Sequence, residues 1–168
     1  MNVKQFILTL LAIVFTTSLF AQDEATIVKV GDKAPEFSIT MQDGTVKKLS
    51  DLKGKVVWIN FFATWCPPCR KELPYLEKEV FNKFKEKDFE VLVIGREHDW
   101  ATVNKFKADN NYALPFYPDA KRDIFSKYAR QNIPRNFIID KEGKIAVAST
   151  GFNHKEFNEI IAKVKELL

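Results

Sequence analysis

Cysteine and histidine are scarce in this sequence, which limits the chemistry that it can perform. Its 168 residues include two cysteines, Cys66 and Cys69, and two histidines, His98 and His154. A structural zinc site usually needs four Cys or His ligands, and the chain has neither a second Cys-x-x-Cys unit nor a spaced histidine pair. We therefore expect no metal site, and we expect each histidine to be a surface or loop residue.

The sequence also has few features of disordered, repetitive or nucleic-acid-binding proteins. The chain has 6 glycines and 7 prolines, no internal repeat and no low-complexity tract, which argues against a disordered chain or a repeat array. The net charge of +4 is modest, and lysines in residues 83–87 alternate with acids, so we expect no nucleic-acid partner. The length, the 46% hydrophobic content and fifteen phenylalanines predict one domain with a large aromatic core.

The longest apolar run lies at the N-terminus and has the organisation of a secretion signal. Lys4 precedes the apolar residues 6–15, and a more polar stretch leads to Ala21. We expect cleavage after Ala21, with residues 22–30 as a linker or N-terminal strand and residues 31–168 as the folded domain. An uncleaved signal would be a single, marginally long membrane anchor. Either outcome places the cysteines outside the cytoplasm, in the periplasm or an equivalent compartment.

The two cysteines lie where a predicted strand meets a predicted helix. Residues 56–62 are apolar and rich in β-branched and aromatic side chains, which predicts a buried strand. A helical pattern follows Cys66, and Pro67 and Pro68 suit its first turn. Free backbone N–H groups and the positive dipole end at a helix start favour a thiolate. The arrangement predicts thiol–disulfide exchange at Cys66 and Cys69.

Two plainer interpretations of the cysteine pair compete with this one. A structural disulfide between Cys66 and Cys69 would close a very short loop, and such a bridge constrains the unfolded chain little. An inert buried pair fits poorly beside a helix start and the polar Thr64. Redox chemistry remains the better interpretation.

The rest of the chain alternates predicted strands and helices. A hairpin is expected from strands 37–41 and 45–49, and a strand at 89–94 is expected to close at Gly95. Asp99 is a predicted N-cap, and Pro74 is expected to kink the helix that follows Cys66. Further elements are expected as a strand at 114–117, a helix of two or three turns around 124–128, strands at 133–140 and 144–149, and a final helix with an apolar stripe from Phe157 to Leu168. This order predicts an α/β sandwich with a mixed sheet.

Several motifs resemble one protein family. They are Ala34-Pro35-Glu36-Phe37, the run Asn60-Phe61-Phe62-Ala63-Thr64-Trp65-Cys66-Pro67-Pro68-Cys69, Glu72-Leu73-Pro74, and Ile133-Pro134 before the strand Phe137-Ile138-Ile139-Asp140. From about Gly31 onward the chain resembles the thioredoxin superfamily, and within it the extracytoplasmic TlpA/ResA-like thiol–disulfide oxidoreductases. The resemblance implies a thioredoxin-like fold, a central mixed β-sheet flanked by helices with an N-terminal β-hairpin extension.

The same resemblance implies the geometry of the site. Cys66 would be exposed and Cys69 largely buried. Pro134 would be cis and would hold the Ile133 backbone beside the cysteines, so that an extended client can pair with it. Trp65, Pro67, Ile133 and Pro134 would contact the client. Arg135 departs from the Thr that many relatives carry, and we expect it to alter the charge of the substrate groove. Neither the resemblance nor the local pattern assigns a function to residues 96–99.

Two positions point to the TlpA/ResA-like subgroup. Cytoplasmic thioredoxins carry a buried Asp six residues before the first cysteine, where this chain has Asn60. Helical spacing alone makes Glu72 either a surface acid that complements the helix start or a group on the same face as Cys69. The resemblance assigns to Glu72 the deprotonation of Cys69, and burial would raise its pKa.

The implied reaction is a two-step exchange. The Cys66 thiolate attacks a client disulfide, and Cys69 resolves the mixed disulfide, so no cofactor is needed beyond this redox-active disulfide. We expect a monomeric reductase whose clients are exported proteins with disulfides, for example in cytochrome c biogenesis, and whose donor is a membrane thiol reductant. One alternative is a peroxiredoxin-like thiol peroxidase. Its loop needs Thr or Ser three residues before the reactive cysteine, where this chain has Ala63, and Thr64 stands one position too late. The other alternative is a secreted metal- or partner-binding module.

Overall fold

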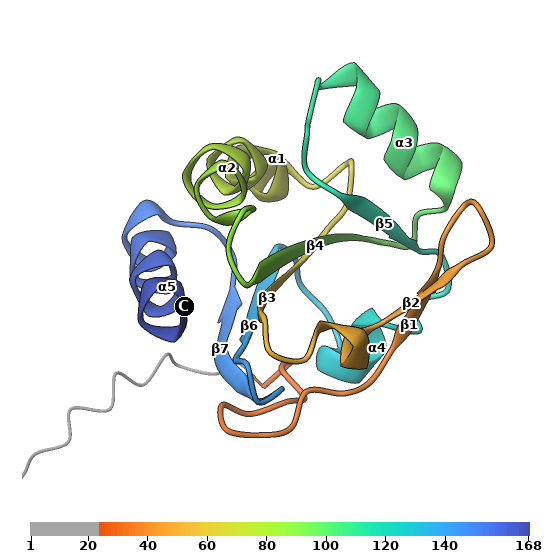
Figure 1. Cartoon of the computed structure of the whole chain (residues 1–168). Helices are drawn as coiled ribbons and strands as arrows, with labels where there is room; N and C mark the ends of the chain where they lie inside the picture. Colours follow the sequence, from red (N-terminus) through yellow and green to blue (C-terminus); the bar gives the residue numbers. More distant parts are fainter. Residues whose placement is uncertain (1–23) are drawn as a thin grey trace, which may run out of the picture.

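The computed structural model describes residues 24–168, which fold around one five-stranded sheet (Figure 1). The predicted secretion signal, residues 1–21, lies outside the described residues. Across the sheet the strand order is β5 (Phe116–Asp119), β4 (Phe89–Arg96), β3 (Val56–Phe62), β6 (Arg135–Ile139) and β7 (Ile145–Thr150). β3 pairs in parallel with β4 and antiparallel with β6, so the sheet is mixed. β1 (Ser38–Thr40) and β2 (Val46–Lys48) form a separate hairpin. The predicted mixed sheet and N-terminal hairpin are confirmed.

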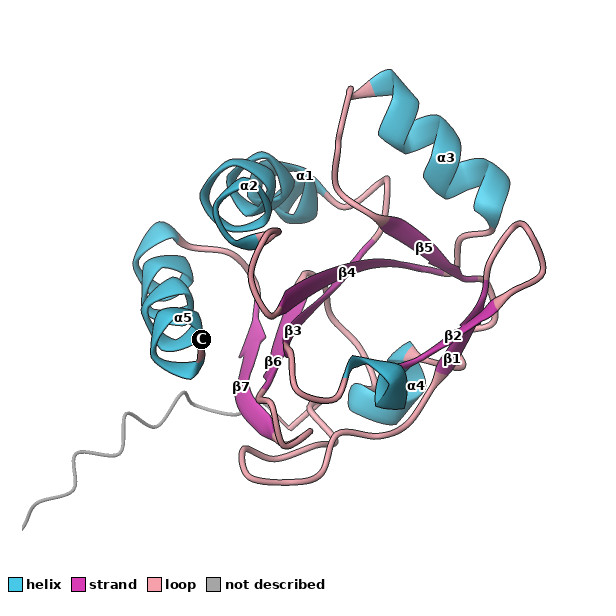
Figure 2. Ribbon diagram, viewed as in Figure 1, coloured by secondary structure: helices cyan, strands magenta, loops and turns pink. Residues whose placement is uncertain are grey.

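Helices cover both faces of this sheet (Figure 2). One face carries the larger group, α1 (Pro67–Tyr75), α2 (Asn82–Phe84), α3 (Trp100–Asp109) and α5 (His154–Leu167). The other face carries α4 (Phe125–Tyr128), the hairpin and the 3₁₀ turn η2 (Leu49–Leu52). The two hydrophobic clusters of the core therefore lie on opposite sides of the sheet.

The alternation of side chains along β3 decides what faces the helix that carries the cysteines. All seven residues of β3 are buried. Trp58 and Phe62 belong to the cluster under α1, whereas Ile59 and Phe61 belong to the cluster on the α4 side. Because successive side chains of a strand point to opposite faces, Asn60 lies on the α1 side with Trp58 and Phe62. A polar residue is thus placed under the helix of the cysteine pair.

Pro74 changes the helix without ending it. α1 continues to Tyr75 and passes directly into a π-helical segment, η3 (Leu76–Phe81). Proline has no N–H to donate, and two residues later the Leu76 amide donates to the carbonyls of both Glu72 and Leu73. The kink expected at Pro74 stays a prediction, while the structure shows a change from α-helical to π-helical bonding after Tyr75.

The predicted end of β4 at Gly95 is wrong. The strand runs to Arg96, and Gly95 pairs with Phe62 on one side and Pro118 on the other. A Cβ built on Gly95 would lie 2.8 Å from Val103 Cγ1, closer than real contacts allow. Glycine is needed here because Val103 of α3 and the His98 side chain both approach this position closely. The Gly95 carbonyl also accepts a hydrogen bond of 3.1 Å from the His98 amide, in the turn that follows β4.

Two further predicted boundaries differ from the structure. β5 begins at Phe116, two residues after the expected start. α4 has four residues, fewer than the two or three turns expected. Its C-cap, Ala129, is extended and forms an antiparallel bridge with Thr26, so pairing with the N-terminal segment ends the helix.

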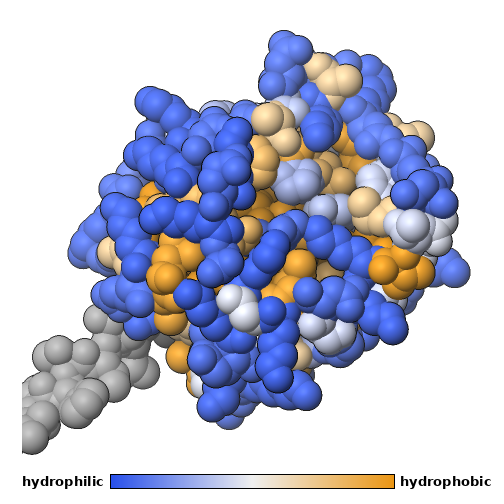
Figure 3. All heavy atoms as spheres, in the orientation of Figure 1, coloured by the Kyte–Doolittle hydropathy of each residue, from blue (hydrophilic) through white to orange (hydrophobic). Residues whose placement is uncertain are grey.

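The surface of the described part is mixed in polarity. In the view of Figure 3, hydrophilic side chains cover most of the surface, with apolar residues showing between them. Within residues 24–168, no helix combines the length and the apolar character needed to cross a membrane.

Candidate active site

Cys66 and Cys69 form a disulfide at the start of α1. Cys66 is the N-cap of this helix and has an extended backbone, and Pro67 occupies the first helical position. The Cys66 Sγ accepts a hydrogen bond from the Cys69 amide at 3.3 Å. This donor is one of the amide groups that lack a helical partner at a helix start, and it would stabilise a Cys66 thiolate after reduction.

The expected exposure of Cys66 is wrong for this oxidised state. Its residue is 3% exposed, and Cys69 is fully buried as expected. The bond to Cys69 holds the Cys66 sulfur toward the helix interior, and the Ile133 carbonyl oxygen lies 3.7 Å away. Trp65 is 60% exposed, and Pro67 is also exposed. The accessible surface of the site is therefore made by the neighbours of Cys66.

The bond between Ile133 and Pro134 is cis, as the resemblance implied. Pro134 is buried and Ile133 half-buried. The Pro134 carbonyl accepts a hydrogen bond of 2.8 Å from the Gly151 amide, which attaches this segment to the end of β7. Ile133 presents its carbonyl to the Cys66 sulfur, so the predicted contact between these two segments is present.

Glu72 lies under α1 in a network of buried polar groups. Its side chain is 1% exposed, and its carboxylate accepts hydrogen bonds from the amide groups of Asn60 and Asn136. The Oδ1 of Asn136 accepts a second hydrogen bond from Asn60 at 2.8 Å and one from the Trp58 indole at 2.7 Å. The Oδ1 of Asn60 is buried and has no partner among residues 24–168. The surface interpretation of Glu72 is thus wrong.

Burial raises the pKa of Glu72 to about 7, because desolvation penalises the carboxylate. The hydrogen bonds from Asn136 and Asn60 act in the opposite direction, and the nearby carboxylate of Glu156 adds to the rise. A group with this pKa exchanges its proton near neutral pH. Glu72 is also three residues after Cys69, on the same face of α1.

Asn136 was missed in the sequence. It lies opposite Asn60 in the antiparallel pairing of β3 with β6, and both strands are otherwise apolar at their centres. Residues in such a pair share one face of the sheet, so both amides face α1. In the sequence Asn136 stands between Arg135 and the apolar residues that end β6, so it gave no signal of its own, and its partner became identifiable only with the strand register.

The expected role of Arg135 in the groove is wrong. Its side chain is fully buried, and its Nε donates to the carbonyls of Gln131 at 2.8 Å and Asn132 at 3.1 Å. Its Nη1 donates to the Thr26 hydroxyl at 2.6 Å. Arg135 pairs with Phe61 in the sheet and therefore faces the α4 side. It joins the loop before Pro134 to the N-terminal segment.

His98 lies in a loop, as expected, but it is buried. Its Nε2 accepts a hydrogen bond of 2.9 Å from the Thr64 amide, and its ring packs edge-on against Phe62 at 6.0 Å. The ring thereby holds the backbone two residues before Cys66. The other histidine, His154, is exposed at the start of α5. Among residues 24–168, no group of three or more His, Cys, Asp and Glu side chains is arranged to hold a metal ion.

Comparisons with known proteins identify the family of this chain. The Redoxin family model matches residues 29–165. A thiol-disulfide oxidoreductase ResA of Bacillus cereus is 36% identical over 129 residues, which cover 77% of this chain and 74% of the relative.

Two solved structures share the fold. One is a candidate protein disulfide isomerase from Bacteroides thetaiotaomicron, with a TM-score of 0.80 and 39% identity over 86% of this chain and 92% of that chain. The other is a candidate thiol:disulfide interchange protein DsbE from Chlorobium tepidum, with a TM-score of 0.75 and 30% identity over 83% of this chain and 98% of that chain. The chain therefore belongs to the Redoxin family and is a thioredoxin-like thiol–disulfide oxidoreductase whose redox group is the Cys66–Cys69 disulfide.

Proposed function

We propose that this protein reduces disulfides of exported proteins outside the cytoplasm, with Cys66 as nucleophile, Cys69 as resolving thiol and Glu72 as general base. The observation that carries the proposal is the buried Glu72 carboxylate, which titrates near pH 7 and lies one helical turn from Cys69. Asn60 cannot take a proton, so Glu72 supplies the base of this buried network.

The first step forms a mixed disulfide. The thiolate of Cys66 attacks one sulfur of the client disulfide, the client S–S bond breaks, and the first client sulfur leaves as a thiolate that takes a proton from solvent. The helix start and the Cys69 amide stabilise the Cys66 thiolate before the attack. The client chain lies against the exposed Trp65 and Pro67 and against the half-buried Ile133, whose backbone the buried cis Pro134 holds beside Cys66.

The second step releases the reduced client. Glu72 takes the proton of the Cys69 thiol, and the Cys69 thiolate attacks the Cys66 sulfur. The bond between Cys66 and the client breaks, the second client thiolate leaves, and the Cys66–Cys69 disulfide forms. Two electrons have then passed from the enzyme to the client. A membrane thiol reductant returns them by exchange with the Cys66–Cys69 disulfide.

The sequence supports the location and the client class. Residues 1–21 act as the secretion signal and residues 31–168 as the oxidoreductase domain, which works as a monomer. Residues 24–30 attach to this domain, for the Ile27 amide donates to the Tyr128 carbonyl at 2.9 Å. Exported proteins whose cysteines must be reduced include apocytochromes c, so cytochrome c biogenesis is the pathway proposed.

The test uses a peptide with an intramolecular disulfide in a Cys-x-x-Cys-His unit. Cys69→Ala should accumulate the mixed disulfide on Cys66, because the resolving thiol is absent, and Cys66→Ala should accumulate none. In the reduced protein, iodoacetamide should label Cys66 first. Labelling of Cys69 first would reverse the two roles. A reduction potential far above that of the glutathione couple would make the protein an oxidant and contradict the reductase assignment.

A further inference from the structure

Two neighbouring arginines, one of which contacts Trp65 of the redox site, take no part in the exchange described above. Arg96 ends β4, and Arg122 lies in the turn between β5 and α4. β4 and β6 flank β3 on opposite sides, so Arg96 and Pro134 approach the end of β3 from opposite directions. Neighbouring strands are about 4.8 Å apart, which places β4 and β6 roughly 10 Å apart, or about three residues of an extended client.

Arg96 is held between two aromatic rings. Its guanidinium carbon lies 5.5 Å from the ring centroid of Trp65 and 5.3 Å from that of Phe125. Its side chain is 13% exposed, and its Nε is buried without a hydrogen-bond acceptor among residues 24–168. The nearest carboxylate is that of Glu97, 3.4 Å from the Nε. The guanidinium is thus fixed in position next to Trp65 with donor capacity left over.

Arg122 shares the surroundings of Arg96. Its guanidinium carbon lies 5.3 Å from the ring centroid of Phe125, and its Nη2 donates to the Arg130 carbonyl at 2.7 Å. Its Nε, like that of Arg96, is buried and has no acceptor within the described chain. The Nη1 lies 3.8 Å from the carboxylate of Glu97. Two guanidinium groups therefore share one carboxylate.

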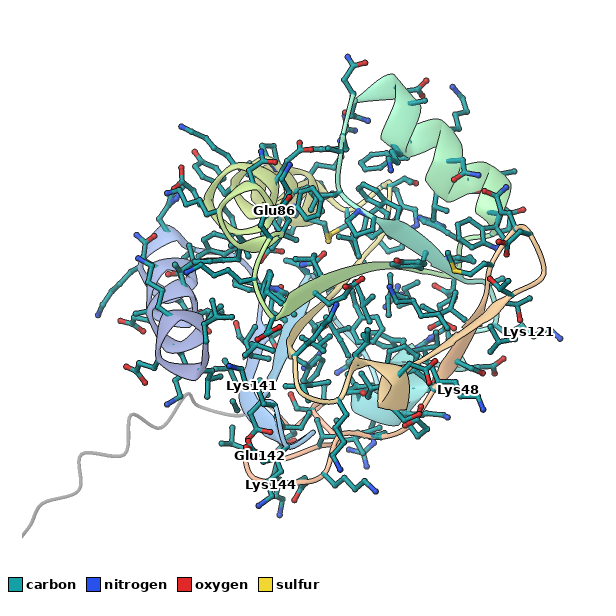
Figure 4. The ribbon with its side chains drawn as sticks, viewed as in Figure 1. Lys48, Glu86, Lys121, Lys141, Glu142 and Lys144 are labelled. Atoms are coloured by element: carbon teal, nitrogen blue, oxygen red, sulfur yellow. A yellow bond between two sulfur atoms is a disulfide. The ribbon has the colours of Figure 1, made fainter. Side chains whose placement is uncertain are left out.

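That carboxylate does not satisfy both cations. Glu97 is 45% exposed, and exposed ion pairs at such distances are weak. The other acid close by, Asp119, uses its two oxygens to accept hydrogen bonds from the amides of Ile124 and Phe125. The charges of Lys121 and Asp123 on either side of Arg122 offset each other, and Lys121 projects outward at the edge of the molecule (Figure 4). The two acids balance the charges of the two arginines, but the Nε atoms of Arg96 and Arg122 both remain without an acceptor among residues 24–168.

The backbone adds an independent observation. Glu97 has a φ of 63° and Arg122 a φ of 62°, both in the left-handed region that residues other than glycine rarely adopt. Unusual backbone conformations persist where the surrounding structure over-determines them, and they cluster at functional sites. Both of these residues belong to the cluster that surrounds the two guanidinium groups.

We propose that Arg96 and Arg122 bind a carboxylate that the client carries within about three residues of its reactive cysteine. This inference rests on the proposed function and names its client class, proteins with acidic residues beside the disulfide. Guanidinium groups match carboxylates through charge-assisted, often bidentate hydrogen bonds. The exposed Trp65 contacts Arg96 and directly precedes Cys66, so one client segment contacts the sulfur, the indole and Arg96 in turn.

The experiment compares two synthetic peptides that contain the same intramolecular disulfide. One carries Asp two and three residues to either side of the cysteines, and the other carries Asn at those positions. The pre-reduced protein should reduce the Asp peptide about tenfold faster at low ionic strength, and 0.5 M salt should lower this ratio because exposed charges are screened. Equal rates for the two peptides would overturn the inference and leave the reductase function standing.

Variants then identify the residues responsible. Arg96→Gln and Arg122→Gln should each lower the preference for the Asp peptide severalfold and leave the rate with the Asn peptide unchanged. Lys144→Gln is the matched control, since it removes one positive charge from the β6–β7 turn, at the opposite end of β6 from the redox site (Figure 4). It should keep the full preference.

Other outcomes separate this inference from its rivals. If Arg96→Gln slows both peptides equally, Arg96 acts only by orienting Trp65, and carboxylate binding is wrong. If a variant does not fold, the comparison of the two peptides with the unmodified protein still shows whether acidic clients are preferred. The protein should first be shown to be fully reduced, with two thiols that react in a thiol assay. If such protein then reduces neither peptide, the proposed function itself is contradicted, and this inference is contradicted with it.

Discussion

The side chain of Asn60 donates a hydrogen bond of 3.0 Å to the carboxylate of Glu72, which joins the central strand to the helix that carries both cysteines. This contact connects the centre of the sheet with the redox chemistry at its edge. Burial raises the pKa of Glu72 to about 7 despite this hydrogen bond, so the rate of exchange and the stability of the fold should depend on the same proton.

Glu72→Gln should slow the resolution of the mixed disulfide by at least roughly tenfold at pH 7, because general bases typically contribute 10²-fold or more. In the unmodified protein this rate should rise with pH through about 7, as Glu72 ionises. The variant should lose that rise. Rapid-mixing measurements of client release between pH 5 and 8 would detect it. Glu86→Gln, at an exposed position after α2 (Figure 4), is the matched control and should behave as the unmodified protein.

The stability of the oxidised protein should fall as pH rises from about 4.5 to about 7. The pKa of Glu72 is higher in the folded state than its ordinary value of 4.5, so the folded state binds more protons in this interval. The shift corresponds to about 3 kcal/mol of unfolding free energy, present below pH 4.5 and lost above pH 7. Urea unfolding at several pH values would measure it. Glu72→Gln should flatten this dependence, and an unchanged slope would show that other groups cause it.

Asn136→Leu should raise the pKa of Glu72, because Asn136 is the hydrogen-bond donor that most lowers it. The midpoint of the pH–rate profile should then move above 7. The free energy of unfolding should also fall by about 1–3 kcal/mol, since the buried Trp58 indole loses its acceptor. Asn158→Leu, at an exposed position of α5, should change neither quantity. A lower midpoint in Asn136→Leu would contradict the assignment of the network.

His98→Phe should loosen the backbone before Cys66. The new ring fills the buried space but offers no acceptor to the Thr64 amide, which is left unsatisfied. Hydrogen exchange at Thr64 should accelerate, and the free energy of unfolding should fall by about 1–3 kcal/mol. His154→Phe provides the comparison at the exposed histidine. Unchanged exchange at Thr64 would mean that His98 only fills space.

The sequence by itself determined the features that depend on neighbouring residues. The apolar run of β3, the start of α1 at the cysteines, the cap at Asp99 and the apolar stripe of α5 were all predicted correctly, because the residues that stabilise them lie within a few positions of one another. The cis bond before Pro134 was also expected, though from the family resemblance rather than from local pattern.

Tertiary structure alone decided the features that depend on strand pairing. The register of β3 with β6 sets Asn136 opposite Asn60 and turns Arg135 to the other face, because side chains alternate along a strand and a one-residue difference reverses their direction. The short α4 ends where Ala129 pairs with Thr26, more than a hundred residues earlier. The position of Arg96 against Trp65 likewise follows from the pairing of β3 with β4, since contacts between distant residues leave no periodic pattern in the sequence.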